Sequence, residues 1–174
     1  TINGEPFFPI MLYHTGLSCE ERMRIGFNSG YGGGGVPTTE EAFAKYVKNT
    51  DDMRASGFKY MGCFIGYYRG GEAAKVAAAM PFLDRDTTFL AYALDEPNGS
   101  PGGIEWARSL YKDVLANGHR RPVVHLLNNP AGAGIFGQAG DVIQPDCYPV
   151  PNRPLVQVAK FIDHARAELS GKRP

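Results

Sequence analysis

Two adjacent carboxylates, Asp95 and Glu96, are the residues of this chain best placed for acid–base chemistry. They follow an apolar run and precede Pro97, so we expect them at the end of a strand. Partial burial and a neighbouring like charge both raise the pKa of a carboxyl group, which can then donate a proton near neutral pH. We therefore expect Glu96 to act as a general acid or base. The alternative is a solvated carboxylate that caps the next helix.

Other polar side chains follow the remaining apolar runs and could bind a substrate. A lone histidine is more often structural, and two asparagines before Pro130 could equally turn the chain. Besides Asp95, the candidates for substrate binding are His14, Asn28, Tyr68, Asn128, Asp146 and Tyr148.

The sequence gives no support for a metal or a cofactor. No two of the four histidines have metal-ligand spacing, and the three cysteines include no C-x-x-C pair. Residues 30–35 match G-x-G-x-x-G, with Asp51 or Asp52 about 20 residues on, as in a dinucleotide-binding loop. However, Pro37 separates this loop from its helix, and the aspartates fall inside that helix. We therefore favour a surface loop.

Composition narrows the class of partner. Eighteen basic and eighteen acidic residues give zero net charge, so no long-range field attracts nucleic acid or an anionic membrane surface. Small neutral partners fit better. No apolar run is long enough to cross a bilayer. At 174 residues and 43% hydrophobic composition, the chain is long enough for one domain with a core.

The expected elements follow from a repeated pattern of apolar run, loop and amphipathic stretch, which is typical of βα units. About six such units are present, which predicts an α/β fold. An open doubly wound sheet would satisfy the pattern as well, but polar residues after nearly every strand favour a barrel, which gathers strand ends around one mouth. We expect strands within 7–13, 26–29, 58–68, 88–94, 122–127 and 141–147, and helices within 18–24, 38–57, 72–83, 104–117 and 155–169.

Three segments resemble glycoside hydrolases of the clan A type. Residues 3–10 (NGEPFFPI) resemble the first strand of these barrels, and 141–149 (DVIQPDCYP) resemble the sixth. Residues 89–97 (FLAYALDEP) are similar to the fourth-strand signature in which the glutamate is the general acid/base. The resemblance implies a (β/α)₈ TIM-type barrel that cleaves O-glycosidic bonds of a poly- or oligosaccharide, with Glu96 as acid/base and no cofactor. It also suggests a secreted or periplasmic location, which the residues themselves leave open.

Two departures from the family pattern qualify this expectation. Asp95 stands where the best-studied members have an asparagine. The family nucleophile is a glutamate at the end of the seventh strand, whereas the sequence ends at Pro174. We therefore expect a single domain over 1–174 that lacks the last two βα units, is inactive alone and self-associates through open barrel edges. Two alternatives are a non-catalytic carbohydrate-binding barrel and a nucleotide-dependent α/β enzyme that uses the glycine loop.

Overall fold

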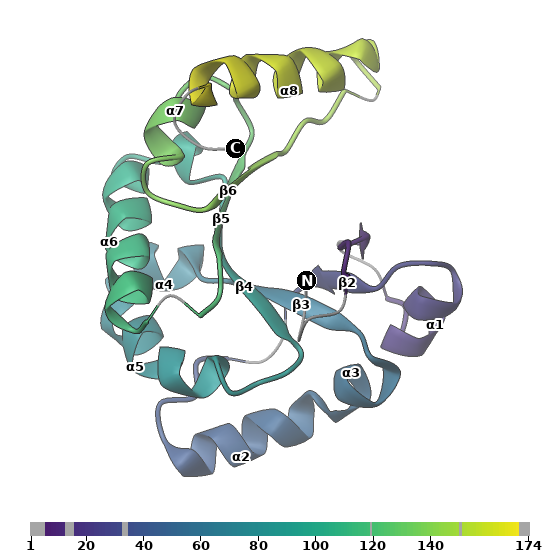
Figure 1. The fold of residues 1–174 in the computed structure, drawn as a ribbon, viewed down its shortest axis with the longest axis vertical. Coiled ribbons are helices and arrows are strands. Elements are labelled where there is room, and N and C mark those ends of the chain that lie inside the picture. The colour runs from purple at the N-terminus through teal and green to yellow at the C-terminus, as the bar shows by residue number, and fades with distance from the viewer. Residues whose placement is uncertain (1–5, 13–15, 33–34, 119, 150, 171–174) are drawn as a thin grey trace. The chain divides into compact units, whose positions relative to one another are not determined.

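The computed structural model describes residues 6–12, 16–32, 35–118, 120–149 and 151–170. Within them, strands and helices alternate along the chain, and the strands form one parallel sheet in the order β1-β2-β3-β4-β5-β6 (Figure 1). This arrangement confirms the predicted α/β class. The strands are β1 (Met11–Leu12), β2 (Ser29–Tyr31), β3 (Lys59–Cys63), β4 (Phe89–Asp95), β5 (Val123–Leu127) and β6 (Val142–Pro145). The helices are α1 (Cys19–Arg24), α2 (Glu40–Asn49), α3 (Asp51–Ser56), α4 (Ile65–Arg69), α5 (Ala73–Leu83), α6 (Gly103–Ala116), α7 (Ala133–Phe136) and α8 (Val156–Leu169).

The chain divides into two compact units. The first consists of residues 1–62 and 78–91, and the second of residues 63–77 and 92–174. The first unit contains β1, β2, most of β3 and the start of β4; the second contains the rest of β4 together with β5 and β6. The expectation of a single barrel domain stays a prediction.

In the first unit, the predicted helix starts are confirmed. The Ser18 hydroxyl accepts from the backbone N–H of Glu21, whose carboxylate accepts from the Ser18 N–H, so a capping box opens α1. Thr39 caps α2. The single helix expected over 38–57 is wrong, because it breaks at Thr50 into α2 and α3. Thr50 leaves the helical conformation and its hydroxyl donates to the carbonyl of Tyr46, one turn back.

The first strand is shorter than predicted. Only Met11 and Leu12 of the expected 7–13 run pair with β2, and Tyr13 lies outside the described residues. The backbone N–H of Ile10 donates instead to the Asn28 side chain, at 2.8 Å. Because a side chain satisfies that donor, the ladder begins only at Met11. The second strand lies at Ser29–Tyr31 and so overlaps the expected range 26–29 only at Ser29.

A buried carboxylate holds the first unit together. Asp86 is fully buried and accepts from the Tyr46 hydroxyl at 2.7 Å, from the Arg54 guanidinium at 3.2 Å, and from the N–H and hydroxyl of Thr88. It therefore joins α2 and α3 to the start of β4. Buried carboxylates are tolerated only when such partners are present.

The second unit is built around β5, whose five residues are all buried. One face of α6 is buried, as expected for an amphipathic helix. The five-residue α4 occupies the end of the 58–68 range, within which a strand was predicted. The four-residue α7 was not predicted. His125, in the middle of β5, is fully buried, with Nε2 2.8 Å from the Ala139 carbonyl oxygen. Across the described residues, every helix is too short or too polar to cross a membrane.

Candidate active site

The C-terminal ends of β4, β5 and β6 lie level with one another in the second unit. The register pairs Asp95 with Leu126, and Leu127 with Pro145. The ladder continues one step past the strands: the Glu96 N–H donates to the Leu126 carbonyl at 3.0 Å. The Asp146 N–H likewise donates to the Leu127 carbonyl at 2.9 Å. The residue that follows each strand therefore stands at one edge, where parallel α/β sheets bind ligands.

Glu96 has a strained backbone. With φ 46° and ψ 46°, it is the one non-glycine residue at positive φ in the described part of the chain. Such a conformation costs of order 1–3 kcal/mol, and it persists only where the surroundings impose it. Here the Gly99 N–H donates to the Glu96 carbonyl in a 3₁₀ turn over Pro97–Gly99. Gly103 allows α6 to begin against that turn, because a Cβ there would collide with the Pro97 carbonyl.

Asp146 and Glu96 interact electrostatically, because the charge of Glu96 is one of the causes that raise the pKa of Asp146. Burial raises the pKa of Asp146 above its ordinary value, and the charges of Glu96 and Asp95 raise it further. This edge of the sheet therefore holds neighbouring carboxyl groups, of which Asp146 has a raised pKa.

Tyr148 completes the cluster. Its hydroxyl donates to Asp146 Oδ2 at 3.0 Å. This bond is the main reason why the pKa of Tyr148 rises to about 12, and it works against the burial that raises the pKa of Asp146. The ring remains 68% exposed, which leaves its faces free for a ligand.

Asp95 lies beside Cys63, the last residue of β3. Burial raises the pKa of the Cys63 thiol, and the Asp95 charge adds to that effect. A cysteine nucleophile needs the opposite shift. The surroundings of Cys63 therefore do not favour a thiolate nucleophile.

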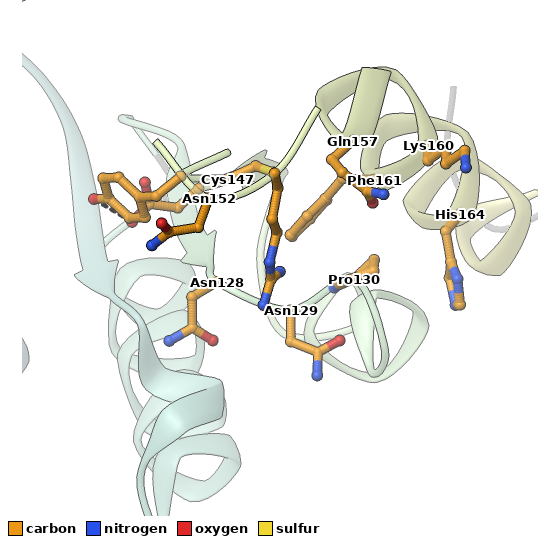
Figure 2. A pocket seen from close by; sticks show the side chains of 12 residues that line it. Asn128, Asn129, Pro130, Cys147, Asn152, Gln157, Lys160, Phe161 and His164 are labelled. Carbon is orange, nitrogen blue, oxygen red and sulfur yellow. Dashed lines mark hydrogen bonds between the residues drawn. The ribbon is translucent and has the colours of Figure 1, made fainter. Parts of the chain in front are cut away.

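A cavity of about 770 Å³ adjoins the cluster (Figure 2). The loop after β5 contributes Asn128 and Asn129, and α8 contributes Gln157, Phe161 and His164. The full lining is Asn128, Asn129, Pro130, Asp146, Cys147, Tyr148, Asn152, Arg153, Gln157, Lys160, Phe161 and His164. The volume of the cavity falls within the usual range for small-molecule sites, whereas most of its lining side chains are polar.

The structure brings most of the predicted site residues of the second unit together, and separates the rest. Asn128, Asp146 and Tyr148 line the cavity, and the charge of Glu96 acts on Asp146. Tyr68 is buried on α4, where the charge it faces is Asp113 of α6. It therefore lies apart from the cluster.

Two further predicted residues give no support to this site. Asn28 belongs to the first unit, where its side chain accepts from Ile10 and donates to the Phe8 carbonyl. His14 lies outside the described residues.

Sequence reasoning missed the charged part of the cavity wall. Arg153 lies in the loop after β6, and Lys160 lies on α8. A signal was present on α8, because Gln157, Lys160 and His164 are spaced by three and four residues and so share one helix face. The sequence pattern predicts a helix over 155–169, but no role was expected for this polar face.

A metal site and a dinucleotide-binding glycine loop are the two other kinds of site. Across the described residues, no group of three or more His, Cys, Asp and Glu side chains is arranged to hold a metal ion. In the glycine loop, Gly33 and Gly34 lie outside the described residues, and Gly30 belongs to β2. Asp51, in the first turn of α3, pairs with Arg54 at 2.8 Å.

No protein-family model and no curated protein matches this chain. The functional argument therefore rests on the residues and their geometry.

Proposed function

We propose that the chain forms part of a (β/α)₈-barrel glycoside hydrolase that cleaves O-glycosidic bonds of a poly- or oligosaccharide, with Glu96 as the general acid/base. The observation that carries the proposal is the carboxyl pair of Glu96 and Asp146 at the C-terminal edge of the sheet. Burial and neighbouring carboxylates raise the pKa of Asp146, and a site that raises the pKa of its carboxyl groups favours protonation of a leaving oxygen. The strained backbone of Glu96 also supports a functional role.

In the proposed reaction, Glu96 donates its proton to the glycosidic oxygen as the bond from that oxygen to the sugar breaks. Asp146 positions Glu96 through the interaction of their charges, while Tyr148 orients Asp146. A second catalytic carboxylate, about 5 Å or more from Glu96 across the sugar, attacks the sugar carbon or activates the water that does so. The proposal assigns that group to a seventh strand, beyond the residues of this sequence.

The proposal is tested by Glu96→Gln, assayed on aryl glycosides with whatever residues follow Pro174 in the protein. Loss of general acid catalysis lowers turnover by about 100-fold or more. The loss shrinks for substrates with a good leaving group, which need little protonation. Glu105→Gln, at an exposed position of α6, is the matched control. Turnover within a few-fold of wild type in Glu96→Gln would reject Glu96 as the acid/base.

A second substitution tests the positioning role of Asp146. Asp146→Asn replaces a titratable group that interacts electrostatically with Glu96 by a neutral amide. We expect a displaced pH–rate profile, which a purely structural residue would not produce. An unchanged profile would leave Glu96 without the partner that we assign to it.

A non-catalytic carbohydrate-binding barrel is the second candidate. It is favoured by the cavity lining, which includes Asp146 and Tyr148 but not Glu96. A binder would retain sugars with equal affinity in wild type and Glu96→Gln, and neither protein would turn over any glycoside. The two candidates are therefore separated by turnover, with binding measured in parallel.

A further inference from the structure

The cavity in the second unit has a basic wall. Arg153 and Lys160 both line it, and neither forms an ion pair with a carboxylate of the described residues. His164, on the same face of α8 as Lys160, is 3.2 Å from Glu168. A guanidinium and an ammonium without carboxylate partners at a concave surface are complementary to an anionic group of a ligand.

The remainder of the lining suits a hydroxylated ligand. Asn128, Asn129, Asn152 and Gln157 contribute amides, and each amide can both donate to and accept from a hydroxyl. The exposed ring of Tyr148 offers an apolar face of the kind that packs against a sugar ring. The volume of about 770 Å³ falls within the usual range for small-ligand sites, roughly 300–1,000 Å³.

The one carboxylate in the lining limits how such a ligand can lie. Asp146 follows β6 directly, whereas Lys160 lies on α8 and Arg153 in the loop between them. An anionic group beside Asp146 would be repelled, so it belongs beside Arg153 and Lys160. The neutral part of the ligand then extends toward Asp146 and its partner Glu96.

We propose that this cavity binds an acidic sugar residue, with its carboxylate or sulfate group held by Arg153 and Lys160 and its hydroxyls by the surrounding amides. The inference rests on the proposed carbohydrate function and names its substrate class. Because the chain has no net charge, the attraction is local and is screened by salt.

The first experiment compares three trisaccharides by isothermal titration calorimetry on the full chain: trigalacturonate, a sulfated galactotriose and neutral galactotriose. We expect the acidic sugars to bind at least about tenfold more tightly than the neutral sugar, the usual size of one charge-assisted hydrogen bond. This preference should fall several-fold between 0.05 and 0.5 M NaCl. Binding of trigalacturonate alone assigns the site to carboxylates, and binding of both acidic sugars assigns it to either anion.

The second experiment removes the cations one at a time, with Arg153→Gln and Lys160→Gln. Both side chains are exposed, so we expect melting temperatures to stay at the wild-type value. Arg153→Gln should weaken binding of the acidic sugar about tenfold and leave neutral-sugar binding unchanged. The matched controls, Arg108→Gln and Lys112→Gln, change exposed residues of α6 outside the cavity and should bind as wild type does.

Equal affinity for acidic and neutral trisaccharides would overturn the inference, as would unchanged binding in both cavity variants or no binding of either acidic sugar. Its failure is distinguishable from failure of the proposed function. Binding of acidic sugars without any turnover keeps this inference and removes the hydrolase. Glu96-dependent turnover of glycosides without preferential binding of the acidic trisaccharides keeps the hydrolase and removes this inference.

Discussion

The carboxylate of Asp86 makes the stability of the first unit depend on one side chain. Asp86→Ala would leave the Tyr46 hydroxyl and the Thr88 hydroxyl without their acceptor and Arg54 without its buried partner. Each hydrogen bond to a charged group contributes about 1.5–3 kcal/mol, but the bonds from four donor groups that share one carboxylate are not additive. Arg54 is one-third exposed and regains water. We therefore expect a loss of about 3–5 kcal/mol, as when one partner of a buried ion pair is removed.

The loss is measured as the change in the free energy of unfolding in urea, followed by far-ultraviolet circular dichroism. Tyr46→Phe removes only one of the bonds and should cost about 1.5–3 kcal/mol. The loss in the double variant should be smaller than the sum of the two single losses by about 1 kcal/mol or more, because each single variant already lacks the bond between Tyr46 and Asp86. The control is Asp52→Ala, an exposed residue of α3, with a change of about 0.5 kcal/mol or less. A loss below about 1 kcal/mol in Asp86→Ala would show that the network does not carry the stability assigned to it.

Three further outcomes follow from the second unit. Burial lowers the pKa of His125, so below about pH 6.5 the unfolded chain binds a proton that the folded chain resists. The free energy of unfolding should therefore fall from pH 7 to 5 and should fall less steeply in His125→Gln, and equal slopes in the two proteins would contradict the assignment. The Glu168 carboxylate accepts from the backbone N–H groups of Gly132 and Gly134, where α7 begins. Glu168→Gln should therefore lower the free energy of unfolding in urea by about 1 kcal/mol and speed hydrogen exchange over 132–136. Unchanged exchange would count against this contact. The Tyr148 hydroxyl lowers the pKa of Asp146, so Tyr148→Phe should raise that pKa in a carbon-13 NMR titration, and a fall would mean that the bond is absent in solution.

The fold class and the centre of the site could be predicted because they depend on local patterns. The run 89–94 is apolar and is followed by a polar pair, so its sequence alone predicts a strand. Parallel strands place their C-terminal residues at one edge, which brings Glu96, Asn128 and Asp146 together.

The rest depends on contacts that have no period in the sequence. Tyr68 lies on a five-residue helix, too short for a periodic signal, and packing turns its ring inward. Asn28 is polar and follows an apolar run, but its amide is used by the backbone of the preceding segment. Arg153 reaches the cavity from a loop, and loop placement follows from tertiary contacts rather than from pattern.

The left-handed backbone of Glu96 has a consequence for how sequences of this fold would diversify. Glycine adopts that conformation freely and asparagine more readily than glutamate, which bears a penalty of about 1–2 kcal/mol there. Without selection on the carboxylate, mutational drift would move position 96 toward those two residues. A saturation library at this position can be sorted once for folding and once for turnover. Glycine and asparagine should be enriched among the best-folded variants, and glutamate should be retained among the variants that turn over substrate.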